Sequence, residues 1–486
     1  MTQPANLIFI LSDEHNKRVT GCYGHPMIQT PNLDALAARG TRFSDAYTNC
    51  PICVPARASF ATGQYVHRIR FWDNAIAYDG SVPSWGHRLM AQGHRVVSIG
   101  KLHYLDSDAK RNGFDEEILP LHIVNRMGDL LGLIRDELPR RPGSAKLGPE
   151  AGRGESEYTE YDRDIAAATV KWLETEAPKH RDRPWALYVG FVSPHFPLIA
   201  PPQFYDMYPE SAVPWPLMYD PAERPRHPFM DAMRKCLCYD EAFDEPMVRR
   251  AITAYFGLTS FLDDNVGKIL RALEATGLMA NTRVVYSSDH GDNLGTRGMW
   301  GKSTMYEESA GIPMIMAGPD VPKGNVCSTP VTLADAFQTF VQGVGAQPHP
   351  DDAALPGTSL IDIAQGLVPR RTILSEYHAA GAISGAYMIR RGKYKYVHYA
   401  NGIPPMLFDL AADPNERNDL GRDPALAGVV AECEAALREV VDPDAVDAMA
   451  RADQAAKIAE HGGREAILKK GTFRYSPPPG SKASFY

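Results

Sequence analysis

Long runs of lysine and arginine are missing from this 486-residue chain, whose formal net charge is −8. A protein that binds nucleic acid through a basic stripe needs such clusters, so the composition argues against a nucleic-acid partner. Cysteine is also scarce. The seven cysteines are an odd number scattered through a large chain, which argues against a disulfide framework.

The start of the chain lacks the features of a targeting segment. No basic residue precedes the first apolar run, Leu7 to Leu11, and this run is too short for the core of a signal peptide or for a membrane span. We interpret the run as a core strand and expect a cytoplasmic protein with no membrane partner.

What the chain does contain is a set of apolar, β-branched runs that each end in polar residues. Continuous apolar runs are typical of strands buried on both faces of a mostly parallel sheet. Ligands bind such sheets beyond the carboxyl ends of the strands, where these polar residues stand. The runs are Leu7 to Leu11 before Asp13-Glu14, Val96 to Ile99 before Lys101 and His103, Ala186 to Val192 before His195, and Val284 to Tyr286 before Asp289-His290.

The remaining segments differ in composition and in the structure that they predict. Helical spacing covers residues 31–40, 163–176 and 248–276. Residues 105–160 and 200–245 are rich in proline, glycine and charge, so we expect loop insertions over the sheet there.

After residue 370 the pattern changes to short alternating strands, such as Ala386 to Arg390 and Tyr394 to His398, with a helix near 425–440. We therefore predict an α/β catalytic domain at 1–368, with a large mostly parallel sheet between helices, and a smaller antiparallel subdomain at 369–445. We predict that residues 446–486 form a tail that packs either on its own body or on a neighbouring subunit, and we assign it as an oligomer contact. Its aromatic residues are Phe473, Tyr475, Phe485 and Tyr486.

One short segment, Cys53-Val54-Pro55-Ala56-Arg57, carries the pattern Cys-x-Pro-x-Arg. Pro55 suits the first turn of a helix, which would put Cys53 at a helix N-terminus that favours anions. Cys50 and Cys53 also form a Cys-x-x-Cys pair, a pattern of redox and zinc sites. A zinc site needs a second such pair, and the other cysteine pair, at 236 and 238, has only one residue between its members. The zinc or redox interpretation is therefore the weaker one.

Four landmarks, in order, give the chain a resemblance to the formylglycine-dependent sulfatases of the alkaline-phosphatase superfamily over residues 5–420. They are Asn6 to Glu14, Cys53 to Gly63, Gly93 to His103, and Asp289 to Gly295 followed by Lys302. Glu14 and His290 stand where many sulfatases have Asp and Asn. With the segment 71–74, they bring the chain closer to the branch of choline sulfatases and phosphonate monoester hydrolases.

The resemblance implies an alkaline-phosphatase-like fold and a nucleophile made from Cys53. A formylglycine-generating enzyme would oxidise Cys53 to formylglycine, whose hydrate carries two geminal hydroxyls. One hydroxyl attacks sulfur, and the other loses its proton as the carbon collapses to the aldehyde and expels sulfate. Arg57 would hydrogen-bond the nucleophile and hold its charge.

The resemblance also implies one divalent cation, Ca²⁺ or Mn²⁺. Its ligands would be Asp13, Asp289, His290 and residue 53, with Glu14 as a further candidate. The cation would acidify the hydrate and neutralise charge on the sulfonyl oxygens.

Further cationic groups would converge on the transferred group, namely Lys101, His195 and Lys302. Either His195 or Lys302 would protonate the leaving oxygen, and His103 would take the proton of the hydrate during collapse. Asn74 is a candidate for contact with the substrate.

These residues predict an enzyme that hydrolyses a small sulfate monoester. A phosphonate monoester or phosphodiester hydrolase with the same machinery is the nearest alternative, because both substrate classes present a single negative charge. Choline sulfate is one candidate substrate, since Trp72, Tyr104 and the tail aromatics are available to hold a quaternary ammonium. An inactive relative that binds a sulfated ligand is the alternative of another class. We also expect a homo-oligomer, either a dimer or a tetramer.

Overall fold

The computed structural model describes residues 2–241 and 243–485; Tyr486 of the predicted tail lies outside them. Its central feature is an eight-stranded sheet. The strand order is β11 (Asn325–Cys327), β2 (Gly40–Phe43), β10 (Met314–Ala317), β9 (Thr282–Ser288), β1 (Asn6–Asp13), β7 (Ala186–Pro194), β4 (Val96–Lys101) and β5 (Glu116–Leu121). The run from β9 to β5 is parallel, and β10 pairs antiparallel with both of its neighbours. The predicted mixed α/β fold with a mostly parallel sheet is confirmed.

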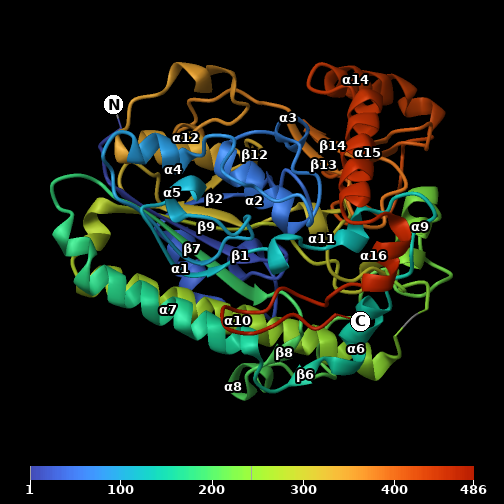
Figure 1. The fold of residues 1–486 in the computed structure, drawn as a ribbon, viewed down its shortest axis with the longest axis horizontal. Helices are drawn as coiled ribbons and strands as arrows, with labels where there is room; N and C mark the ends of the chain where they lie inside the picture. The colour runs from blue at the N-terminus through green and yellow to red at the C-terminus, as the bar shows by residue number, and fades with distance from the viewer. Residues whose placement is uncertain (1, 242, 486) are drawn as a thin grey trace.

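Helices cover both faces of this sheet, and strand β1 shows why. Successive side chains of a strand point to opposite faces. Phe9 packs in one apolar cluster with residues of α2 (Cys53–Thr62), α4 (Trp85–Met90) and α12 (Asp335–Val344). Ile8 and Ile10 pack in another with α1 (Pro31–Ala38), α7 (Glu157–Thr175) and α10 (Glu245–Ala275). Figure 1 shows α7 and α10 on one side of the sheet and α4 and α12 on the other.

The C-terminal part forms a separate four-stranded antiparallel sheet, in the order β13 (Ile373–Tyr377), β14 (Ala386–Arg391), β15 (Tyr394–Tyr399) and β16 (Met406–Asp409). The predicted hairpin is its β14–β15 pair. Helices α14 (Ala427–Arg438), α15 (Pro443–Glu460) and α16 (Arg464–Lys470) follow. The domain boundary expected at residue 446 falls inside α15.

The expectation of loop insertions was wrong for part of 105–160. Residues 116–121 form β5, the edge strand of the large sheet. The charged Glu116 and Glu117 hide this strand in the sequence, because an edge strand is exposed along one side and needs no continuous apolar run. Between β8 (Ile199–Ala200) and α10, the described residues hold two short helices, α8 (Pro202–Tyr205) and α9 (Pro228–Cys236).

A set of buried charges joins the C-terminal sheet to the large one. Lys395 of β15, which has no exposed surface, lies 3.1 Å from Glu307 and 2.6 Å from Glu416. Glu307, in helix α11 (Glu307–Ala310), also lies 2.6 Å from Lys17, which follows β1. We call these groups the interface cluster; its further members are Arg18, Arg297 and Glu308.

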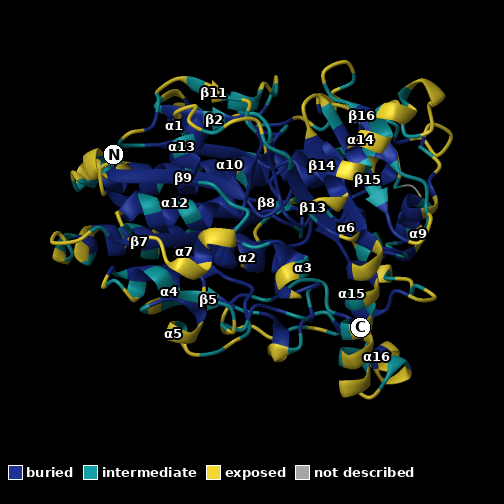
Figure 2. Cartoon of the chain, turned by 90° about the horizontal axis from the view of Figure 1, so that it is seen from above, coloured by how far each residue is buried: buried dark blue, intermediate teal, exposed yellow. Residues whose placement is uncertain are grey.

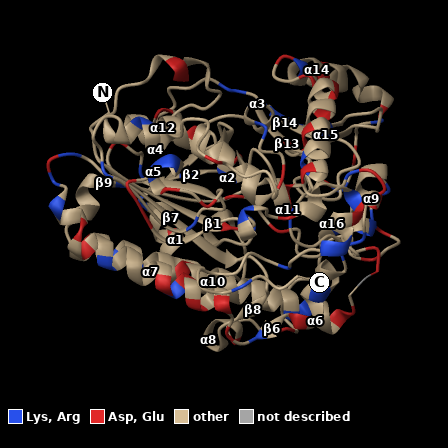
Figure 3. Cartoon of the chain, in the orientation of Figure 1, with Lys and Arg blue, Asp and Glu red and all other residues tan. Residues whose placement is uncertain are grey.

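Exposed residues gather at the periphery, as Figure 2 shows for α5 (Ala109–Asn112), α14 and α16. Acidic and basic residues are interspersed along α7 in Figure 3. Within residues 2–241 and 243–485, no helix is long and apolar enough to cross a membrane.

Candidate active site

The candidate site lies where adjacent strands of the large sheet end. Strands β9, β1, β7 and β4 are neighbours, so their carboxyl ends meet at one edge. Asp13 ends β1, Lys101 ends β4, His195 follows β7, and Asp289-His290 follow β9. The four polar clusters recognised in the sequence are thus brought together.

A bulge in β4 aims Lys101 at the site. The register against β5 shifts between Ile99 and Lys101, and Gly100 between them has a φ of 95°. A Cβ atom at this glycine would lie 2.3 Å from the carbonyl oxygen of Gly190 in β7, so no larger residue fits. Lys101 Nζ consequently lies 2.5 Å from Asp13 Oδ2.

Cys53 is the first residue of helix α2, as the position of Pro55 predicts, and is 1% exposed. The Asn74 side chain does not stand free: its Oδ1 accepts a hydrogen bond from the backbone N–H of Val54 at 3.1 Å and so braces the start of α2. Burial and the charge of Asp13 raise the pKa of the Cys53 thiol to about 11. An unmodified Cys53 would therefore be protonated at neutral pH and a weak nucleophile in the surroundings described.

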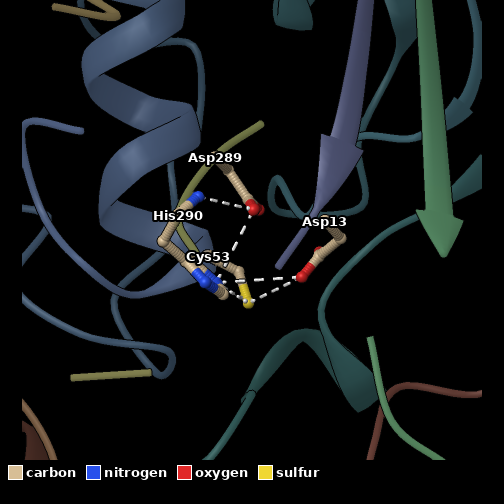
Figure 4. Close-up of side chains that lie close together, drawn as sticks. All are labelled: Asp13, Cys53, Asp289 and His290. Carbon is tan, nitrogen blue, oxygen red and sulfur yellow. Dashed lines mark hydrogen bonds and ion pairs between the residues drawn. The ribbon is translucent and has the colours of Figure 1, made fainter. Parts of the chain in front are cut away.

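Four side chains offer ligand atoms to one cation: Asp13, Cys53, Asp289 and His290 (Figure 4). Cys53 Sγ lies 3.2 Å from His290 Nε2 and 3.7 Å from Asp13 Oδ1. His290 Nε2 lies 3.7 Å from Asp13 Oδ1 and 3.6 Å from Asp289 Oδ1. With metal–ligand bonds of about 2.0–2.6 Å, ligand atoms around one cation lie roughly 3–4 Å apart, so the spacing fits.

The orientation of the His290 ring also suits a metal ligand. Its Nδ1 lies 3.1 Å from the carbonyl oxygen of Gly291, to which an N–H can donate. That hydrogen bond leaves the lone pair of Nε2 facing the carboxylates, as a metal-bound histidine requires. Two carboxylates and one imidazole suit a divalent cation of intermediate hardness.

Arg57 donates hydrogen bonds to the carboxylates of Asp13 and Asp289. Its Nε donates to Asp289 Oδ2 at 2.8 Å and its Nη2 to Asp13 Oδ2 at 3.2 Å. Its Nη1 donates to the Lys101 carbonyl and to the hydroxyl of Tyr188, at 2.8 and 2.7 Å. The guanidinium was expected from the sequence to bond the nucleophile; it instead bonds Asp13 and Asp289 and orients two of the candidate metal ligands.

Lys302 lies on the other side of residue 53. Its Nζ is 3.1 Å from Cys53 Sγ, 2.7 Å from His195 Nε2 and 3.4 Å from Glu14 Oε2. His195 Nδ1 lies 2.6 Å from the carbonyl oxygen of Phe196, so Nε2 is the nitrogen that can accept from the Lys302 ammonium. Burial and the charge of Lys302 lower the pKa of His195 well below its usual value, which keeps the ring neutral.

Glu14 belongs to a different group from the four-residue cluster. It shares Asp13 and His195 as neighbours, and its Oε1 is buried with no hydrogen-bond partner among the described residues. Burial raises the pKa of Glu14 well above its usual value. We call Asp13, Glu14, Arg57, Lys101, Asp289 and Lys302 the catalytic cluster.

The site opens into a cavity of about 140 Å³, close to the roughly 150 Å³ that accommodates a benzene molecule in an apolar cavity. Aromatic residues line it, among them Tyr158, Phe196, Tyr239 and Trp300. Tail residues 472–476 line it too. Of the aromatics expected from the sequence to hold a quaternary ammonium, Phe473 and Tyr475 line the cavity, whereas Trp72 and Tyr104 do not; no sequence signal pointed to Tyr158.

Among the described residues, the predicted catalytic residue whose side chain contacts the tail is His103. Its Nε2 lies 2.9 Å from the hydroxyl of Ser476. Burial and the charge of Lys101 lower the pKa of His103 well below its usual value.

Comparison with known proteins gives consistent matches. The family described as Sulfatase matches residues 5–346, and the family described as N-sulphoglucosamine sulphohydrolase, C-terminal, matches residues 295–442. The choline-sulfatase of Rhizobium meliloti (strain 1021) is 32% identical over 512 aligned residues, covering 99% of this chain and 95% of that protein. Arylsulfatase K of Homo sapiens is 28% identical, covering 85% and 78%. The solved phosphonate monoester hydrolase of Agrobacterium radiobacter has a TM-score of 0.71 at 21% identity, covering 90% and 95%, which shows a shared fold.

Proposed function

Because the chain belongs to the sulfatase family, whose members hydrolyse sulfate esters, we propose that its nucleophile is a formylglycine made from Cys53. The observation that carries the proposal is the surroundings of residue 53. It begins helix α2, within 3.1 Å of Lys302 Nζ and 3.2 Å of His290 Nε2. Formylglycine hydrate supplies two geminal hydroxyls, one to attack sulfur and one whose deprotonation releases sulfate. One hydroxyl oxygen of the hydrate would occupy the position that Cys53 Sγ has in the structure.

The side chains around residue 53 would divide the proton transfers between them. Lys302 carries a proton beside the nucleophile and donates toward His195 Nε2, so this pair would supply the proton that the leaving ester oxygen needs. His103 has a buried Nδ1 without a partner among the described residues, and this nitrogen would accept the proton of the second hydroxyl. The N-terminus of α2 and the ammonium of Lys101 would favour the negative charge of the transferred group.

One divalent cation would be held by Asp13, Asp289, His290 and residue 53. It would act as a Lewis acid toward the sulfonyl oxygens. We propose Ca²⁺ or Mn²⁺, since the carboxylates suit both and the imidazole favours Mn²⁺. Chelation should abolish turnover, and adding back each ion separately, with the bound metal measured by mass spectrometry, identifies the one that restores it.

The cavity beyond the sulfate end supports a compact alcohol. The aromatic rings that line the cavity suit an aryl group or, through cation–π contact, a quaternary ammonium such as choline. Asp129 also lines the cavity, but Arg141 Nη2 lies 2.6 Å from it and neutralises its charge. We therefore expect a higher kcat/KM for 4-nitrophenyl sulfate than for choline sulfate, a comparison that a chromatographic sulfate-release assay makes directly.

The test of the function is made on protein produced together with a formylglycine-generating enzyme. The tryptic peptide Phe43–Arg57 should carry the mass of the aldehyde in place of the thiol, and the protein should hydrolyse 4-nitrophenyl sulfate. Cys53→Ala should abolish that activity; full residual activity would refute the proposed nucleophile. Faster turnover of an aryl phosphonate monoester than of the sulfate would favour the phosphonate alternative.

The proposal also covers when Cys53 is modified, where the protein is located and how many subunits it has. Cys53 is 1% exposed, so a maturing enzyme would have to act before the sheet and α2 pack together. A cytoplasmic location and a homo-oligomer, dimer or tetramer, remain predictions. Cell fractionation tests the first, and light scattering of the purified protein tests the second.

A further inference from the structure

The chain that follows α16 turns back toward the candidate site. Figure 1 shows this C-terminal segment running from α16 along the side of the molecule where α10 lies. Tyr475 packs against the apolar cluster formed with α7 and α10. The aromatic tail therefore packs against its own chain, and Ser476 is 6% exposed.

Three contacts hold residues 472–476 in place. The hydroxyl of Tyr158, in α7, donates to the carbonyl oxygen of Ser476 at 2.8 Å. The rings of Tyr158 and Tyr475 lie 4.9 Å apart between centroids. Thr472 donates from its hydroxyl to Asp129 Oδ1 at 3.0 Å. The segment is thus fixed at both ends, with its last residue beside His103.

The contact between Ser476 and His103 uses one ring nitrogen and leaves the other free. Ser476 Oγ lies 2.9 Å from Nε2, whereas Nδ1 is buried and has no partner within the described part of the chain. A neutral histidine has one N–H and one lone pair, and the hydrogen bond at one nitrogen selects the role of the other. When Nε2 donates to Ser476 Oγ, Nδ1 carries the lone pair that a general base needs.

We infer that Ser476 is a positioning residue of the catalytic site, which holds His103 Nε2 and leaves Nδ1 as the nitrogen that accepts the proton. Nothing in the sequence motifs points to it, because 373 positions separate the two residues. The inference rests on the role proposed above for His103. It makes residues 472–476 part of the catalytic site.

Ser476→Ala tests the inference, with turnover of 4-nitrophenyl sulfate as the measurement. Loss of a hydrogen bond that orients a catalytic histidine is expected to lower kcat by about 10–100-fold, the range found for other groups that orient active-site ligands. KM should stay within about twofold. Ser476→Thr keeps the hydroxyl and should recover most of kcat. The matched control is Ser481→Ala on the same tail, whose hydroxyl donates to Glu157 and whose loss should leave kcat unchanged.

A double-mutant cycle separates positioning from a general loss of structure. In a His103→Ala background, Ser476→Ala should cause no further loss of kcat, because the hydroxyl then has no imidazole to orient. The same fold-loss in both backgrounds would overturn the inference. So would a Ser476→Ala enzyme with wild-type kcat. Hydrogen exchange at residues 472–476 checks that the tail stays seated in each variant.

A second measurement works without turnover. The ¹⁵N chemical shifts of the His103 ring report which nitrogen carries the proton, and Ser476→Ala should change them. Identical shifts in the two proteins would overturn the inference. An inactive but correctly matured wild type would count against the proposed function instead, and the shifts would still decide the role of Ser476.

Discussion

Two lysines face glutamates in different settings: Lys302 is partly buried, and Lys395 is fully buried. Lys302 lies 3.4 Å from Glu14 in the catalytic cluster, which opens into the cavity. Lys395 has no exposed surface and lies between Glu307 and Glu416 in the interface cluster. Burial raises the pKa of Glu14 well above its usual value. Burial acts on Glu307 in the same direction, but Lys17 and Lys395 hold its pKa well below that value.

The difference lies in how completely the charges are paired. The interface cluster joins the two sheets, and each of its carboxylates lies within 3.1 Å of a lysine or arginine nitrogen, although burial still raises the pKa of Glu416. The catalytic cluster keeps a Glu14 oxygen without a hydrogen-bond partner among the described residues and a lysine beside Cys53 Sγ, at a cost in stability. Such under-paired charges are typical of functional sites.

The largest effect is expected from Lys395→Met. The substitution leaves Glu307 and Glu416 buried with one cation fewer, and breaking a buried ion pair costs about 3–5 kcal/mol. Urea titration should show this decrease in the free energy of unfolding. The kcat of the folded fraction should stay within about twofold of wild type. A variant that is stable but inactive would contradict the structural role.

Lys302→Met should show the opposite pattern. Loss of a cation beside the transferred group is expected to lower kcat/KM about 10²–10³-fold. The free energy of unfolding should change by no more than about 1 kcal/mol, because Glu14 can take up a proton where its pKa is already raised. Steady-state kinetics and urea titration on one preparation measure both. A stability loss as large as that of Lys395→Met would show that the two clusters do not differ.

Asp447, in α15, extends the comparison to pH. Burial opposes its ionisation, but Arg135, 2.5 Å away, lowers its pKa to about 2 from the usual 3.8. The folded-state pKa is depressed, so the stabilisation is present above pH 4 and is lost as the pH falls from about 4 to 2. Asp447→Asn should lower the free energy of unfolding by about 2 kcal/mol at pH 7. Urea titrations between pH 7 and 3 should show the difference from wild type shrinking below pH 4; a constant difference would contradict the linkage.

The smallest effect is expected from Lys393→Met, two residues before Lys395. Lys393 pairs with Asp409 at 2.6 Å, but its side chain is 53% exposed. Exposed pairs contribute little, so the free energy of unfolding should change by less than about 0.5 kcal/mol. The same urea titration measures it. Equal losses from Lys393→Met and Lys395→Met would mean that burial does not set the strength of these pairs.

The sequence predicted the fold and the catalytic cluster for the same reason. Apolar runs that are buried on both faces stand out, and the polar residues after β1, β4, β7 and β9 meet because those strands are neighbours. Cys53 was recognisable from its pentapeptide, and Pro55 predicted its place at the start of α2.

The rest depended on contacts that no local pattern records. Strand β5 has an exposed edge and therefore no continuous apolar run. The bonds from Arg57 to Asp13 and Asp289 follow from the packing of α2 on the sheet. Ser476 reaches His103 because the chain turns back after α16, and a tail rich in proline has no periodicity that predicts where it packs.

The position of Ser476 near the C-terminal end also means that it is synthesised after the other residues of the site. A ribosome makes residues 472–476 after every strand of both sheets, so the candidate metal ligands, helix α2 and Lys302 all exist before the residue that contacts His103. A chain that stops or is cut before residue 472 could still assemble the sheet and bind sulfate weakly at its edge. It would lack Ser476 and one wall of the cavity. Under the role inferred for Ser476, full activity would depend on a polypeptide that still contains residues 472–476.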